Sequence, residues 1–495
     1  MKSSTFARCA TCVTLVAALG MVPAVAEASG FATARFGGER GNPVEFNPTA
    51  LYYNPAGIAF SQGFNAMLDI AWVYRTASYE RPHYAVGGQR ISDPDDNAAA
   101  IAANAGEGTV SNFLYAPMAG LTYSLEESAG IPLALGLAFY VPFGGSTIWD
   151  QVEGSEMFPG AEDGPNRWFA IEGSIRTLAF TLGAAYRIEP LRLGIGVGAN
   201  LYLSDVDTLR ARTGEATDRL LDEGRRPGQY ALLEGRALAQ ASSTDFGLGV
   251  GLLWEAVEDT FWVGASWQSR PGFNGRMVYD GELTQILGTE TEYRVDDIQM
   301  TSQLPDIFRL GLRYRPSSQW EVRTFMDFSR WSAFDQQCIV ATNNVQGDIY
   351  DFCRTRVDGS FDNDAANNLV ITNIPRRWND AVGIRAGASF WPGGHEDGNL
   401  ELLFGAGYDG NAVPDNTLEP ALMDMTKFSL SLGSRIALGD NVGFMLTASN
   451  IFYQQRDTRA EAFRQPWQSG TRQPNSAGIY NQNVFIVGTN FDFAF

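Results

Sequence analysis

The sequence offers few residues that could form a catalytic or metal-binding cluster, and this scarcity limits the functions that the protein can have. The chain of 495 residues has two histidines, His83 in a predicted long loop and His395 in a predicted turn, so neither is placed as a buried base. No Ser/His/acid set stands out, and no metal-ligand spacing or phosphate-binding glycine loop occurs. The sequence predicts recognition rather than reaction: not an enzyme, with no metal and no cofactor.

The four cysteines fall into two pairs. Cys9 and Cys12 lie in a segment that we expect to be removed, so the mature chain keeps Cys338 and Cys353. Two cysteines in an exported protein favour a disulfide that closes a short loop. The alternative is a zinc site, which needs further ligands, and none is nearby.

The first 28 residues have the composition of an export signal. Lys2 and Arg8 supply a positive end, a small and apolar stretch follows, and residues 26–28 (AEA) fit the small-x-small cleavage pattern. A membrane anchor is the alternative, but the apolar run is too short to span a bilayer. The sequence therefore predicts a signal peptide over residues 1–28.

Composition narrows the class of protein. The formal net charge of −20 argues against nucleic acid as a partner, because nucleic-acid binding needs a basic face. Aromatic residues make up 12% of the chain and helical periodicity is scarce. After the signal no run of about 18 apolar residues occurs, which argues against membrane-spanning helices.

Alternating residues dominate the rest of the chain. From Phe485 to Phe495 the odd-numbered residues are mostly large and apolar. The even-numbered residues between them are small or polar, apart from Ile486. This period of two is typical of a strand, and it recurs at 191–204 and 320–329. One face is almost unbroken and apolar, while the other mixes glycine with polar residues, as a barrel in lipid requires. A soluble β-sandwich is the alternative.

The order of these segments predicts the topology. Short connections alternate with long ones, which is the plan of bacterial outer-membrane barrels. We therefore expect an all-β fold, a 14-stranded antiparallel transmembrane β-barrel over residues 64–495, in contact with outer-membrane lipid and lipopolysaccharide. Phe495, at the end of an aromatic strand, fits the signal read by the barrel-assembly machinery. The predicted strands are near 64–81, 113–124, 132–149, 168–187, 191–209, 244–256, 260–279, 302–315, 319–334, 378–391, 399–410, 427–437, 441–454 and 482–495.

Residues 29–63 precede the first strand and lack its periodicity. They are rich in glycine and proline, and residues 47–60 (NPTALYYNPAGIAF) contain two Asn-Pro steps. Proline fixes its own φ and restricts the residue before it, so this segment is stiff. An open barrel of this size would leak, and a compact segment in the lumen would stop that. We expect an N-terminal hatch. A disordered periplasmic tail is the alternative, but Tyr52 and Ile58 make the segment too apolar to prefer water.

Several stretches together resemble the long-chain fatty-acid transporter (FadL) family of outer-membrane proteins, which includes uptake channels for toluene-like aromatics. Each is weak alone, but they occur in order over essentially the whole mature chain. They are Ser29-Gly30-Phe31, Asn54-Pro55-Ala56, 183–202 (GAAYRIEPLRLGIGVGANLY), 304–306 (LPD), 328–334 (FSRWSAF) and 488–495 (GTNFDFAF).

The resemblance implies a passive channel, expected here as a monomer. Its ligand would bind in an apolar pocket and leave sideways into the membrane, through a gap made by a kink in the third strand. The third predicted strand contains Pro142-Phe143-Gly144-Gly145, where proline removes a ladder donor and glycine weakens pairing. An ordinary bulge is the alternative. The expected ligand is a long-chain fatty acid, with aromatic or alkane hydrocarbons as the alternative.

The resemblance also implies which residues bind the ligand. Matching the glycine-rich strand residue by residue places Arg210 at the family's pocket arginine, and Arg212 lies on the same strand face. An arginine can hold a carboxylate through two parallel hydrogen bonds. The alternative is an arginine at the base of a loop, paired with Asp205 or Asp207. Phe31 is expected to line the pocket, because the family's N-terminus folds into it.

Overall fold

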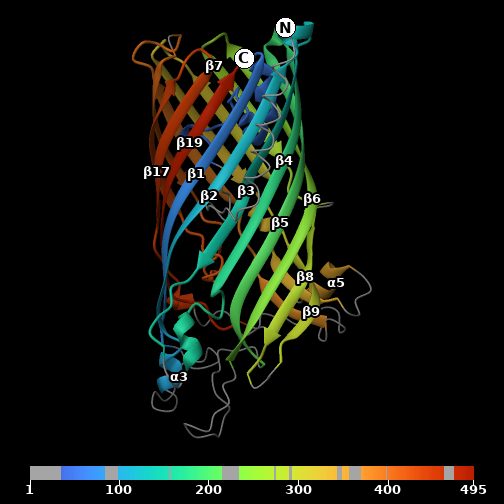
Figure 1. The fold of residues 1–495 in the computed structure, drawn as a ribbon, viewed down its shortest axis with the longest axis vertical. Helices are drawn as coiled ribbons and strands as arrows, with labels where there is room; N and C mark the ends of the chain where they lie inside the picture. The colour runs from blue at the N-terminus through green and yellow to red at the C-terminus, as the bar shows by residue number, and fades with distance from the viewer. Residues whose placement is uncertain are drawn as a thin grey trace, which may run out of the picture.

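The computed structural model describes residues 35–83, 98–154, 158–214, 234–272, 275–288, 292–342, 348–355, 369–396, 398–461 and 473–495. Over these residues the chain forms a closed antiparallel β-barrel of fourteen strands (Figure 1). The predicted fold class is confirmed. Among the described helices, none is both long enough and apolar enough to cross a bilayer.

The wall strands pair antiparallel with their neighbours, and β1 pairs with β19 to close the barrel. Phe64 and Phe495 exchange backbone hydrogen bonds of 2.7 and 2.8 Å at this seam. The long loops lie at the opposite end from the C-terminus (Figure 1). The wall strands are β1 (Phe64–Arg81), β2 (Gly106–Ser124), β3 (Leu133–Ile148), β4 (Glu172–Ile188), β5 (Leu193–Thr213), β6 (Glu234–Val257), β7 (Phe261–Gln268), β10 (Ile307–Tyr314), β11 (Trp320–Ser329), β14 (Ala381–Phe390), β15 (Leu400–Asp409), β16 (Lys427–Ala437), β17 (Val442–Tyr453) and β19 (Ile479–Ala494).

Alternation along each strand separates the lipid face from the lumen face. In β6, Phe246, Leu248 and Leu252 are exposed on the outside of the barrel. Gly249 and Gly251, between them, are buried towards the lumen. Because the outer face meets hydrocarbon, its apolar side chains need no protein cover, and the inner face can keep small residues.

Five further strands lie within stretches that we expected to be mainly loops. One is the two-residue β18 (Arg456–Asp457), which pairs with β19. The other four are β8 (Met277–Ile286), β9 (Arg294–Ser302), β12 (Gln336–Ala341) and β13 (Val370–Pro375). A single strand was expected over 260–279, but β7 ends at Gln268 and β8 pairs with the first half of β6 instead. β9 then pairs with β8, β12 with β9, and β13 with β12. This outer sheet, as we call the four strands, extends the wall at the long-loop end (Figure 1).

Residues 35–63, which we call the lumen segment, form three short helices: η1 (Gly38–Arg40), α2 (Ala50–Tyr53) and η2 (Pro55–Phe60). These helices contact β4, β5 and β6 on one side and β14, β15 and β16 on the other. Since those two groups of strands lie on opposite sides of the ring, the segment lies inside the barrel.

Candidate functional site

A pocket in the lumen lies between the long-loop ends of the strands and the outer sheet. It encloses about 920 Å³ of space, part of it open to solvent. Side chains of β4, β5, β8, β9 and β13 make its wall largely apolar. They include Phe169 (just before β4), Ile175, Val206, Leu283, Met300 and Ile371.

β5 brings both predicted arginines to this pocket. Along this strand the even-numbered residues face the lumen, and Arg210 and Arg212 both line the pocket. Asp205 and Asp207 belong to the opposite face, where they accept hydrogen bonds from Arg176 (2.8 Å) and Gln240 (2.7 Å). Strand alternation therefore directs Arg210 into the pocket and away from these two carboxylates.

The polar end of the pocket is a connected network from segments far apart in sequence. In the amide orientation that satisfies its hydrogen bonds, Gln473 accepts from Arg210 Nη1 and donates to Glu419 Oε2, both at 3.0 Å. Glu419 also pairs with Arg376 Nη1 at 2.7 Å. Among the described residues, three arginines and one glutamate line the pocket, so cationic side chains outnumber anionic ones in this described lining.

Sequence analysis did not identify Arg376, Glu419 or Gln473. All three fall in stretches expected to be long connections, where no periodicity says which way a side chain points. Just before Arg376, the β-branched residues Val370, Ile371, Thr372 and Ile374, now in β13, were a usable strand signal.

The wall opens beside this pocket, between β2 and β3. The β2–β3 ladder begins at Ser124 and Ala134 and stops after Met118 and Tyr140. Beyond that point one isolated bridge, Val110 to Trp149, rejoins the strands. No ladder pair links residues 111–117 to residues 141–148, all of which the structure describes. We call this interval the wall gap.

Prolines flank the start of the wall gap. The β2–β3 ladder ends at Met118 and Tyr140; Pro117 is the neighbour of Met118 on the gap side, and Pro142 lies two residues beyond Tyr140. Neither proline can donate to a ladder. On its other edge β3 stays paired with β4, but the register shifts between Tyr140 and Phe143. The extra residue reverses the alternation, so Gly145 and Thr147 line the pocket.

The structure thus places the predicted lateral residues next to the predicted arginines. Gly145 shares the pocket lining with Arg210 and Arg212, and Phe143 packs edge-on against Trp331 at 6.1 Å between ring centroids. Phe31 lies outside the described residues.

The Asn54-Pro55-Ala56 corner is fixed by its own side chain and by the wall. Asn54 Oδ1 caps η2 by accepting from the Ala56 amide at 3.1 Å, and Asn54 Nδ2 donates to Leu252 O at 2.9 Å. Gly196 and Gly251 face each other on β5 and β6 at this place. A Cβ on Gly251 would overlap Asn54 Oδ1, so the corner approaches the wall closely because these positions lack side chains.

Buried ion pairs hold the opposite side of the lumen segment. Arg35 pairs with Asp409 (2.7 Å), Glu39 with Arg385 (3.0 Å) and Arg40 with Glu401 (2.8 Å). Burial acts to lower the pKa of Arg35, but the carboxylates of Glu39 and Asp409 outweigh it, and the pKa is raised above its ordinary value. Removing one partner of such a pair leaves an uncompensated buried charge.

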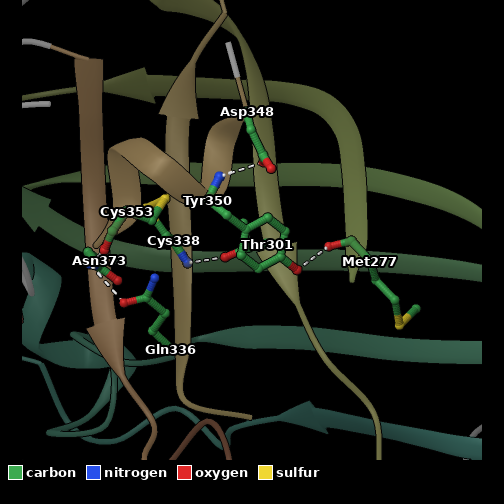
Figure 2. The surroundings of a disulfide bond; sticks show 8 residues. All are labelled: Met277, Thr301, Gln336, Cys338, Asp348, Tyr350, Cys353 and Asn373. Atoms are coloured by element: carbon green, nitrogen blue, oxygen red, sulfur yellow. Dashed lines mark hydrogen bonds between the residues drawn. A yellow bond between two sulfur atoms is a disulfide. The ribbon is translucent and has the colours of Figure 1, made fainter. Parts of the chain in front are cut away.

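A disulfide joins Cys338 of β12 to Cys353, the last residue of α5 (Ile349–Cys353). Figure 2 shows how α5 is tied to the outer sheet: Asn373 of β13 donates to Cys353 O at 2.7 Å, and Tyr350 donates to Met277 O of β8 at 3.0 Å. The residues on either side of Cys338, Gln337 and Ile339, line the pocket. The disulfide therefore fastens the strand that forms part of the pocket wall.

Breaking this disulfide should loosen the outer sheet without unfolding the barrel. Its cysteines are 15 positions apart, and closing a loop of that length contributes about 3 kcal/mol. In a Cys338→Ala, Cys353→Ala double variant, amides of β12 and β13 should exchange hydrogen roughly a hundredfold faster, while those of β16 and β17 keep their rates. Equal exchange in β12 with and without the cysteines would contradict this. So would two thiols that can be alkylated without reductant in the wild-type protein.

The family comparison and the structural comparisons agree. The model of the family described as outer membrane protein transport protein (OMPP1/FadL/TodX) matches residues 9–495. The fold is similar to that of a Pseudomonas aeruginosa FadL homologue (14% identity, 96% of this chain and 99% of that chain, TM-score 0.68). It is also similar to the P. putida toluene transporter TodX (14% identity, 91% of this chain and 94% of that chain, TM-score 0.59). The third is the Ralstonia pickettii toluene transporter TbuX (14% identity, 92% of this chain and 99% of that chain, TM-score 0.56). No protein of curated function matches the sequence significantly.

Proposed function

The chain belongs to the OMPP1/FadL/TodX family, whose members are channels for hydrophobic compounds in the outer membrane of Gram-negative bacteria, and on that premise we propose that it admits long-chain fatty acids by passive flow. The membership bears out the resemblance seen in the sequence. The finer assignment, to fatty acids, depends on the chemistry of the pocket.

The charge of the pocket is the observation that supports a fatty acid. A carboxylate that leaves water must be paired with a cation, or it is protonated or excluded. The pocket offers an apolar wall for an alkyl chain and, at one end, Arg210, Arg212 and Arg376 with one carboxylate, Glu419. An arginine keeps its charge when buried and presents a fork that fits a carboxylate.

The position of the wall gap supports a lateral exit. Gly145 and Thr147 belong both to the pocket lining and to the stretch of β3 that is detached from β2. A ligand that enters at the long-loop end and fills the pocket therefore reaches the bilayer through the wall. The lumen segment serves as the hatch, and its Asn54-Pro55-Ala56 corner closes the direct way to the periplasm. Flux follows the gradient of the ligand.

An aromatic hydrocarbon is the second candidate ligand. TodX and TbuX, two of the similar structures, are described as toluene transporters. Phe169 and Met300 of the pocket wall give an uncharged ring favourable packing partners. Such a ligand would make no use of the three arginines.

Replacing Arg210 with alanine separates the two candidates. The variant should bind laurate roughly tenfold to a hundredfold more weakly, which is the contribution of one charge-assisted hydrogen bond, and should bind toluene as the wild type does. Lysine at this position should recover part of the loss, since it supplies charge without the fork. Binding is measured by titration calorimetry on the purified protein.

The control is Arg176→Ala, which removes a guanidinium from neighbouring β4, where it bonds Asp205 and does not line the pocket. This change should leave laurate affinity unaltered. If the wild type prefers toluene to laurate and Arg210→Ala alters neither affinity, the fatty-acid assignment is wrong.

A further inference from the structure

Arg75 of β1 reaches across the inside of the wall to β3. Its side chain is 1% exposed and lies on the lumen face. Nε and Nη2 donate to Gln482 Oε1 of β19 at 3.3 and 2.9 Å. Nη1 donates to Ser146 O at 3.2 Å and to Thr147 Oγ1 at 2.9 Å. One guanidinium therefore connects β19, β1 and β3, passing β2.

The acceptors on β3 lie inside the wall gap. Ser146 belongs to the stretch that has no ladder pair with β2, and its carbonyl also accepts from Asn112 Nδ2 of β2 at 3.1 Å. Side chains of β1 and β2 thus hold the detached stretch where backbone pairing has ended. Of the two, Arg75 makes more bonds to β3 and is the more buried.

The same guanidinium lies at the border of the pocket. Thr147, which accepts from Arg75 Nη1, also lines the pocket. A ligand that moves from Arg210 towards the gap passes this point. A carboxylate offers a guanidinium an opposite charge and two oxygens that match its fork, which the neutral oxygens of Ser146 and Thr147 do not. A carboxylate can therefore take the place of Ser146 O and Thr147 Oγ1.

We propose that Arg75 is a latch on the wall gap that the carboxylate of the departing ligand releases. Without ligand, Arg75 holds residues 146–147 against β1 and β2 and keeps the gap narrow. When a carboxylate bonds Nη1, the detached stretch of β3 is set free and the gap widens. An uncharged ligand of the same length does not release it. This inference rests on the lateral exit and the fatty-acid ligand proposed above.

The width of the gap can be measured by double electron–electron resonance, which gives the distance between two spin labels, one on each edge of the gap. Phe113 of β2 and Ile148 of β3 are 81% and 59% exposed on the lipid side, so cysteines there accept labels without entering the lumen. Cys338 and Cys353 are bonded to each other and stay unlabelled. The protein is placed in lipid nanodiscs and measured alone, with laurate, and with methyl laurate, which has the chain but no charge.

The wild type should give a short distance that laurate lengthens and methyl laurate leaves unchanged. Arg75→Met, which keeps bulk but removes the donors, should give the long distance without ligand and no response to laurate. The matched control is Arg309→Met on β10. Arg309 is also buried and donates to Tyr52 O and Gln268 Oε1, away from the gap. This control should behave as the wild type does.

Two results overturn the latch. One is an Arg75→Met protein with the wild-type distance and the wild-type laurate response. The other is a wild-type distance that laurate leaves unchanged although calorimetry shows that it binds. Absence of laurate binding overturns the proposed ligand instead, and the ligand-free comparison of Arg75→Met with wild type still decides whether Arg75 holds the gap. Should Arg75→Met fail to fold, Thr147→Val removes one acceptor on β3 and should lengthen the ligand-free distance in the same direction.

Discussion

Deletion of Pro142 should seal the barrel wall and reduce fatty-acid uptake to the level of cells that lack the protein. From Tyr140 to Phe143, β3 advances three positions while β4 advances two, from Ala179 to Thr177. Across the wall gap, β3 advances nine positions from Tyr140 to Trp149 while β2 advances eight from Met118 to Val110. Over this interval β3 thus has one residue more than either of its neighbours, β2 and β4. Its removal restores a single alternation and a continuous ladder.

The matched control is Pro142→Ala, which supplies a backbone donor but keeps the extra residue. It should retain most of the uptake, because the register shift remains. Both variants should show the heat-dependent gel mobility of a folded barrel. Calorimetry on the deletion variant should still detect laurate binding, since the polar end of the pocket is intact. Normal uptake by a folded deletion variant would show that the ligand leaves by another route.

Removal of residues 29–60 should turn the protein into an open pore. The described part of this segment, residues 35–60, lies in the lumen between β4–β6 and β14–β16, and an empty barrel of fourteen strands leaves a water-filled channel. The wall itself should survive, because Arg385 keeps Asp327 and Asp409 as partners and Arg323 keeps Glu321. Single-channel conductance in planar bilayers should rise from near zero to that of a porin-sized channel. Conductance equal to wild type would contradict a sealing role.

A pair of single substitutions tests the same seal more gently. Valine at Gly251 would overlap Asn54 and force the Asn54-Pro55-Ala56 corner off the wall, whereas Gly249, two residues away on the same face, has open space around its Cβ. Gly251→Val should therefore raise conductance, and Gly249→Val should not. Equal effects would mean that any added bulk in β6, and not loss of this contact, disturbs the lumen.

Strand alternation predicted all fourteen wall strands because lipid and lumen impose opposite demands on successive residues. In β5 the outward residues Ile195 and Val197 are exposed to the hydrocarbon, and the inward residues Gly196 and Gly198 are small. The pattern also predicted the short turns, since each falls between two alternating segments. The positions of the seam and of the two barrel ends follow from that pattern alone.

The strands of the outer sheet could not be predicted from alternation in the same way. β9 carries Asp296 and Asp297 in succession, which places a carboxylate on each of its faces, so its sequence lacks the unbroken apolar face of a membrane strand. The pocket was only half predicted for a related reason. Arg210 and Arg212 lie on a regular strand, so alternation predicted the face on which they lie. Closure of the barrel brings three further residues to them, and local periodicity does not predict such contacts; these residues are Arg376, Glu419 and Gln473.

The ion pairs of the lumen segment also have a kinetic consequence. Arg35 and Asp409 are separated by 374 positions, and the Glu39 amide and Ser431 Oγ by 392. Contacts of such separation are among the slowest to form, because the intervening chain must lose its conformational entropy first. The lumen segment is the earliest described part of the chain to be synthesised and among the last that can become ordered. A fluorophore attached to it would therefore report the completion of barrel assembly rather than its beginning.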